Sequence, residues 1–125
     1  MAFSIHTMDV GKTASYEYLH TATTIEAGTA LTLAAGELVK CAATTRPEFI
    51  AAGPANEEGI VPVVRVQSYI VFETELSASG GSLHIGDKVT IDADSKRVTA
   101  TTGSGVAVIV SMDGTAVGSR VCVRF

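Results

Sequence analysis

The sequence predicts an all-β domain, a small barrel or sandwich of about eight to ten short, mostly antiparallel strands. Three observations favour this class. Val and Thr are frequent, and both fit the pleated surface of a strand. Turn residues recur at the roughly 8–12-residue spacing that is typical of sandwiches and barrels. No convincing amphipathic helical pattern interrupts them, which argues against a parallel α/β sheet.

The clearest hairpin signal lies in residues 83–98, LHIGDKVTIDADSKRV. Polar and apolar residues alternate over 88–92 and again over 97–100, as in strands with one face toward a core. Residues 92–96 between them form a polar turn, because Asp and Ser side chains hydrogen-bond nearby backbone groups. The sequence therefore predicts a hairpin here.

The other expected strands cover residues 30–33, 38–42, 49–52, 60–66, 69–76, 106–110 and 121–125. Within 69–76, we expect Ile70, Phe72, Thr74 and Leu76 to share one face, and Tyr69, Val71, Glu73 and Glu75 the other. Residues 106–110 are apolar on both faces and are predicted to form the most buried strand. In the last strand, Val121, Val123 and Phe125 point one way, and Cys122 and Arg124 the other.

Residues 1–24 differ from the rest, since they are rich in Thr, Ser and Ala and hold two of the three histidines. We interpret them as an extended N-terminal arm or an edge strand that gains order by pairing or docking. Residues 25–125 are expected to form a single β-domain, because 125 residues suit one domain with its own core.

Charge and composition narrow the classes of partner. The net charge is −4 and the nine Lys and Arg residues are scattered, so no nucleic-acid partner is expected. No run is long enough to span a membrane, and a secretory signal pattern is absent, which predicts synthesis in a cytoplasm. There Cys41 and Cys122 are expected to be reduced, buried thiols. Only 18% of the residues are charged, which favours a surface partly covered by an oligomer contact or another partner; the alternative is a neutral surface rich in Ala and Thr.

A search for reactive groups yields no catalytic, cofactor-binding or metal-ligating residues, so we expect no enzyme and no cofactor. The candidates that we weighed were His6, His20 and His84, the carboxylate pairs Glu57–Glu58, Glu73–Glu75 and Asp92–Asp94, and the glycine runs 80–82 and 103–105. The histidines lack partners at metal-ligand spacing. The carboxylates fit solvated strand and turn positions, and no helix follows the glycines to bind phosphate.

Several segments, in order, resemble a known family. They are AGTALTL at 27–33, GELVK at 36–40, TTRPEFIA at 44–51, LHIGDKV at 83–89 and GSRVCVRF at 118–125. This order resembles small β-rich proteins that are encoded beside the major capsid gene of tailed phages and prophages, similar in kind to head decoration, or capsid cement, proteins. The resemblance spans about residues 25–125, through strand and turn motifs that carry no active-site residue.

The resemblance implies a structural virion protein at the capsid surface. Its partner would be the major capsid protein, which it would stabilise as a homo-oligomer, with a trimer favoured. We expect residues 1–24 to dock to the capsid or to a sister subunit, so that their deletion abolishes binding with little effect on thermal unfolding. The alternatives are a phage tail or head-fibre adaptor, or a carbohydrate-binding β-module. The last needs exposed aromatic rings, for which only Tyr16, Tyr18 and Tyr69 are candidates besides Phe.

Overall fold

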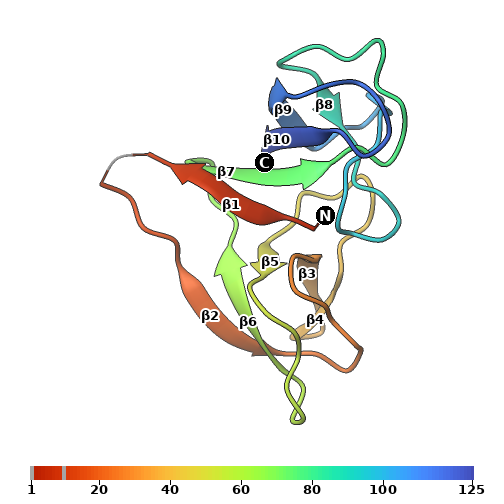
Figure 1. Cartoon of the computed structure of the whole chain (residues 1–125). Helices are drawn as coiled ribbons and strands as arrows, with labels where there is room; N and C mark the ends of the chain where they lie inside the picture. The colour runs from red at the N-terminus through yellow and green to blue at the C-terminus, as the bar shows by residue number, and fades with distance from the viewer. Residues whose placement is uncertain (1, 10) are drawn as a thin grey trace.

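Ten strands form two five-stranded antiparallel sheets in this computed structural model, which describes residues 2–9 and 11–125 (Figure 1). The first sheet has the order β1 (Ser4–Met8), β7 (Ile70–Glu75), β10 (Arg120–Arg124), β9 (Ala107–Met112) and β8 (Lys88–Val89). The second has the order β2 (Tyr16–His20), β6 (Ile60–Arg65), β5 (Phe49–Ala51), β3 (Ala30–Ala34) and β4 (Glu37–Lys40). The described residues contain no helix, and so none that is long and apolar enough to cross a membrane. The all-β prediction is confirmed, and of its two forms the chain adopts the sandwich.

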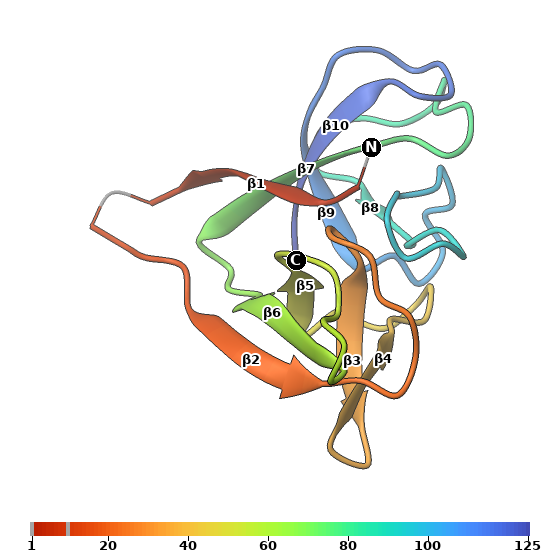
Figure 2. The same cartoon turned by 60° about the horizontal axis from the view of Figure 1, so that its bottom comes forward.

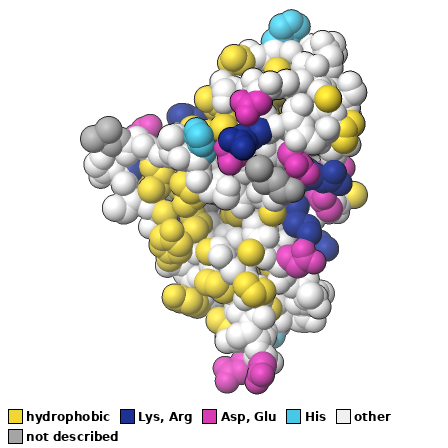
Figure 3. All heavy atoms as spheres, in the orientation of Figure 1, with side chains coloured by type: hydrophobic (Ala, Val, Ile, Leu, Met, Phe, Trp, Pro, Cys, Tyr) yellow, Lys and Arg dark blue, Asp and Glu magenta, His cyan; other side chains and the backbone are white. Residues whose placement is uncertain are grey.

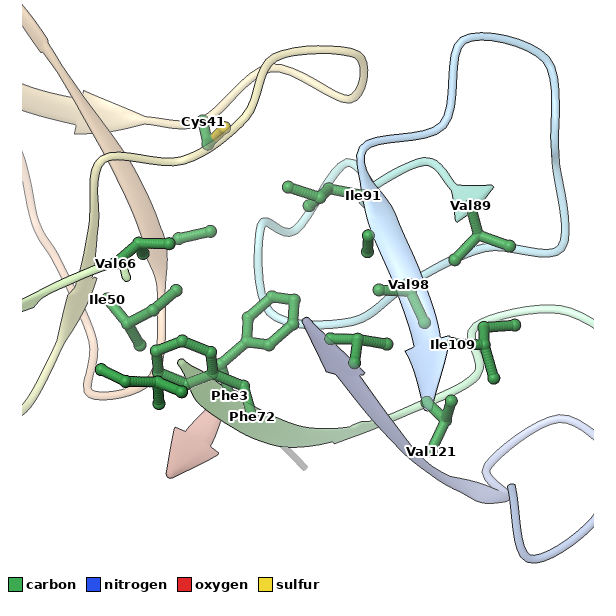
Figure 4. Packing of buried hydrophobic residues seen from close by; sticks show 14 of the residues in the cluster. Phe3, Cys41, Ile50, Val66, Phe72, Val89, Ile91, Val98, Ile109 and Val121 are labelled. Carbon is green, nitrogen blue, oxygen red and sulfur yellow. The ribbon is translucent and has the colours of Figure 1, made fainter. Parts of the chain in front are cut away.

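The main core lies between the two sheets (Figure 4). The first sheet contributes Ile70, Phe72 and Val121, and the second contributes Ile50 and Val64. The face of β7 that was predicted to point inward is fully buried. It carries Ile70, Phe72 and Thr74, and Leu76, directly after the strand, continues it. Thr74 remains satisfied there because its hydroxyl donates to the backbone carbonyl of Lys96.

A second cluster of apolar residues packs on the other face of the second sheet, and Phe49, Val61 and Val63 are among them. β5 is therefore buried on both faces, whereas β6 is fully buried only at Val61, Val63 and Val64, and its Arg65 is exposed. The second sheet curves, so that the end of β2 approaches β4 (Figure 2). Thr21, just after β2, forms a parallel bridge with Leu38 of β4, and its Oγ1 donates to the Leu38 carbonyl at 3.0 Å.

The N-terminal residues form two edge strands. β1 pairs with β7 in the first sheet, and β2 pairs with β6 in the second. Phe3, just before β1, is buried in the main core. Of the two alternatives for residues 1–24, the structure thus shows edge strands, and the extended arm is not shown. Met1 and Val10 of this segment lie outside the described residues.

The expected hairpin at 83–98 forms only in its inner part. Ile91 and Val98 make an antiparallel bridge, and the Asp92 N–H donates to the Arg97 carbonyl at 2.8 Å, so the turn predicted at residues 92–96 is confirmed. The strand before it is short, however. β8 spans two residues, and its ladder partner is β9 instead of residues 97–100.

The prediction that residues 106–110 form the most buried strand is wrong. Val110 is 37% exposed, and Val108 is only partly buried. β9 lies inside the first sheet, between β8 and β10, but one face of that sheet is not covered by the second sheet. An antiparallel sheet can expose one face, and valines are tolerated there.

Candidate functional site

An apolar groove opens where the two sheets diverge. β1 and β2 follow each other in the chain but belong to different sheets, and Figure 1 shows them separating from each other. The groove between them has a volume of about 520 Å³. Its walls include Phe3, Ile5, Tyr16, Ile50, Val64 and Phe72. None of the described residues that line it carries a charge, so it suits an apolar or backbone ligand.

Strand register explains why aromatic side chains border this groove. Tyr16 lies opposite Val64 and Tyr18 lies opposite Pro62, so both tyrosines share the face of the second sheet that turns toward the first. Tyr16 and Tyr18 nevertheless remain 61% and 73% exposed. Figure 3 shows hydrophobic side chains gathered on the surface between β1 and β2. We call the groove together with these two tyrosines the β1–β2 surface.

The backbone of β2 adds a second recognition element to the β1–β2 surface. The Arg65 N–H donates to the Ser15 carbonyl, and the Thr21 N–H donates to the Gly59 carbonyl, each at 2.8 Å. Because hydrogen-bonding direction alternates along a strand, Tyr16 and Tyr18 direct their backbone groups away from β6, whereas the end of β2 bridges β4 through Thr21 and Leu38. An outer strand of this kind can accept an added strand from another chain.

Side-chain contacts hold β2 in place beside the groove. Arg65 Nε and an amino group of its guanidinium donate to the two carboxylate oxygens of Glu17 at 2.7 and 2.9 Å. This hydrogen bonding raises the pKa of Arg65. At the far end of β2, His20 Nδ1 lies 3.2 Å from Glu37 Oε1 of β4. The edge strand is thus fixed to two neighbours, and its exposed tyrosines are presented by a defined backbone.

Most of the polar residues that the sequence singled out have structural partners. Asp94 accepts hydrogen bonds from the Lys96 and Arg97 N–H groups, and its Oδ2 lies 2.8 Å from Arg97 Nε. Burial raises the pKa of Asp94, but these hydrogen bonds and the Arg97 charge outweigh it and hold the pKa below its usual value. Asp92 Oδ2 lies 3.5 Å from the same guanidinium. The Asp92–Asp94 pair therefore closes a turn around Arg97.

The remaining sequence candidates lie apart from the β1–β2 surface. His84 lies 3.9 Å from Asp87, and Glu57 and Glu58 are exposed in the loop before β6. The glycine runs 80–82 and 103–105 lie in loops, neither of which leads into a helix. Cys41 belongs to the main core and its thiol donates to the Thr45 carbonyl at 2.9 Å. Both cysteines are free and buried, as predicted.

Sequence reasoning missed one cluster. His6, Glu73 and Cys122 lie on β1, β7 and β10, and their potential ligand atoms are all within 4.8 Å of one another. His6 Nδ1 is 3.6 Å from Glu73 Oε1. The three residues are distant in the sequence, so only knowledge of which strands pair, and in what register, would have brought them together. The expectation for the histidines rested on spacing along the chain, and it said nothing about partners such as Glu73 and Cys122 that pairing strands bring beside His6.

Comparison with known proteins adds no family assignment to this geometry. A scan of protein-family models finds no match to the chain, and a search of curated protein sequences finds no significant match.

Proposed function

We propose that this protein is a structural virion protein that binds the assembled capsid of a tailed phage and stabilises it as a decoration protein. The resemblance of residues 25–125 to such proteins supports the class of function. The observation that carries the proposal within the structure is the β1–β2 surface, an uncharged groove beside an outer strand with two exposed tyrosines. In this proposal the major capsid protein is the partner, and the protein acts as a homo-oligomer, with a trimer favoured.

Binding would combine strand addition with burial of aromatic rings. An extended segment of the capsid protein pairs with the outward backbone groups of β2 and covers Tyr16 and Tyr18. Tyr is enriched among the residues that contribute most to protein interfaces. The groove offers little charge to desolvate, so most of its buried area would favour binding. A protein that binds only the assembled shell stabilises that shell by mass action.

The proposal is tested by mixing the purified protein with shells assembled from the major capsid protein and separating bound from free protein by sedimentation. We expect the wild type to sediment with the shells and the double variant Tyr16→Ser, Tyr18→Ser to remain in the supernatant. Ile85→Ser is the matched control, because Ile85 is equally exposed, at 70%, but lies in the loop before β8, at the opposite edge of the first sheet. Wild-type protein that fails to bind any shell would refute the decoration role.

Two further measurements separate the alternatives. Light scattering gives the solution mass. A trimer supports the decoration role, whereas a monomer favours an adaptor or a carbohydrate-binding module. One observation favours the carbohydrate-binding alternative. Tyr16 and Tyr18 lie two residues apart on the same exposed face, where their rings could stack on a sugar. Retention of the wild type, but not of the double tyrosine variant, on immobilised polysaccharide would favour that function.

A further inference from the structure

We propose that His6, Glu73 and Cys122 form a binding site for Zn²⁺ on the face of the first sheet that points away from the main core. The three residues come from the adjacent strands β1, β7 and β10. Each offers one ligand atom, an imidazole nitrogen, a carboxylate oxygen and a thiolate sulfur. This site is separate from the β1–β2 surface and does not depend on the proposed capsid function.

Strand register places the three side chains together. Cys122 of β10 lies directly opposite Glu73 of β7, so their side chains share a face. On the other side of β7, Ser4 of β1 also lies opposite Glu73, and the register shifts between Ile5 and Thr7. His6 is the extra residue of this bulge. Bulges commonly redirect a side chain, and here the imidazole comes to lie beside the Glu73 carboxylate.

The distances and burial suit a metal ion that closes the cluster. Ligand atoms around tetrahedral zinc are about 3.3–3.8 Å apart, since each bond is about 2.0–2.3 Å. The 3.6 Å between His6 Nδ1 and Glu73 Oε1 already falls in that range, and the full set lies within 4.8 Å. Cys122 and the Glu73 side chain are held by the sheet at 5% and 19% exposure. The His6 side chain is 48% exposed, so it has room to move and bring its ring nitrogen to bonding distance of an ion held by Glu73 and Cys122.

The donor set selects the class of metal. A thiolate together with an imidazole favours zinc over Mg²⁺ and Ca²⁺, which prefer oxygen ligands. Three protein ligands leave a fourth tetrahedral position for water or for a group from another molecule. The bound ion would connect the edge strand β1 to β7 and β10, and so would stabilise the folded chain by mass action.

The positive charge of Arg120 competes with a metal ion for the Glu73 carboxylate. Arg120 Nε lies 3.6 Å from Glu73 Oε1, the oxygen that also faces His6. The same Nε lies 3.9 Å from Asp113 Oδ2, which offers an alternative partner. We infer that a metal ion displaces the guanidinium toward Asp113. Removal of the Arg120 charge should therefore tighten binding, whereas a purely structural ion-pair network would predict no gain.

The test is a titration of the whole, metal-free protein with Co²⁺, followed by competition with Zn²⁺. A thiolate bound to Co²⁺ produces an absorption band that reports directly on a cysteine ligand. We expect this band in the wild type and in Cys41→Ser, and its loss in Cys122→Ser. His6→Gln should weaken metal binding by about tenfold or more. Loss of even a residue that only hydrogen-bonds to a ligand lowers metal affinity by about 10–100-fold. Arg120→Gln should strengthen binding.

The variants also distinguish the site from general thiol or histidine binding. His84→Gln removes an exposed histidine outside the cluster and should leave the titration unchanged. Thermal unfolding of the wild type should shift to a higher temperature with Zn²⁺. The shift should shrink in His6→Gln, because His6 is half-exposed and its replacement leaves the core intact. A wild type without a thiolate band, or a band that persists in Cys122→Ser, would overturn the proposal.

Discussion

Phe3 and Phe125 pack edge to face, with ring centroids 5.6 Å apart and ring planes inclined by 62°. The Phe125 ring also lies 5.8 Å from that of Phe72 in β7. Aromatic pairs in this arrangement stabilise the folded state by more than the burial of their surface alone. Phe3 thus joins the start of β1 to the core between the sheets, which ties the N-terminal residues to the stability of the whole domain.

The first prediction follows from this contact. Phe3→Ala should lower the free energy of unfolding by about 3 kcal/mol, because it removes a buried ring and leaves a cavity beside the groove. Deletion of residues 1–24 should cost more, in contrast to the sequence-based expectation that unfolding would be nearly unaffected. Urea denaturation measures both changes. His84→Ala, at an exposed position, serves as the control and should change stability by less than about 0.5 kcal/mol.

A second prediction concerns the close approach of Gly105 to β8. A Cβ added at Gly105 would lie 2.2 Å from the Lys88 carbonyl oxygen and 2.6 Å from the Val89 nitrogen. Since both atoms belong to the backbone, Gly105→Ala must separate β8 from the chain before β9, at a cost of about 2 kcal/mol or more. Gly103→Ala is the matched control, because nothing lies within 4 Å of its added Cβ. Equal melting temperatures for the two variants would contradict the packing described here.

The turn around Arg97 gives a third prediction. Asp94→Ala removes the acceptor of two backbone N–H groups and of the Arg97 guanidinium, so it should destabilise the fold by about 1–2 kcal/mol. The lowered pKa of Asp94 means that its contribution is present above the ordinary carboxyl pKa and is lost as the pH falls through the folded-state pKa. The difference between wild type and variant should therefore shrink under acidic conditions. Asp113→Ala, which removes an exposed carboxylate 3.9 Å from Arg120, should have little effect at either pH.

Cys41 provides a fourth prediction, on alkaline stability. Burial, with the charge of Glu48 adding to it, raises the pKa of this thiol from 9.0 to about 11. The unfolded chain therefore loses the thiol proton before the folded chain does, and the free energy of unfolding falls as the pH rises from about 9 to 11. The loss attributable to Cys41 should be at most about 2–3 kcal/mol.

The comparison of wild type with Cys41→Ala isolates this effect from the lysines and tyrosines that titrate in the same range. Chemical denaturation at a series of pH values should show the stability difference between the two proteins narrowing as the pH increases. Thiol labelling of the folded protein should also be slow at Cys41 at neutral pH, because the thiolate is the reactive form. A stability difference that is constant from pH 8 to about 11 would show that Cys41 keeps its ordinary pKa.

The alternation of polar and apolar residues, and the turn residues, predicted the structure correctly where neighbours along the chain determine a residue's environment. Alternation along 69–76 predicted the buried face of Ile70, Phe72 and Leu76, and Asp and Ser at 92–96 predicted the turn that Asp94 closes. The same local rule failed at Val110, where an apolar side chain remains on an open face. Successive side chains of a strand point to opposite faces whether or not both faces are covered. The sequence of the strand therefore does not show whether another layer packs on the second face.

The sequence by itself therefore determined the fold class, the positions of most strands and the buried face of β7. Only the tertiary structure decided that β1 and β2 join different sheets, that an apolar groove opens between them, and that His6 meets Glu73 and Cys122. The physical reason is that alternation and turn chemistry act over a few residues, whereas strand partners, register and the β1 bulge depend on packing between residues far apart in the chain.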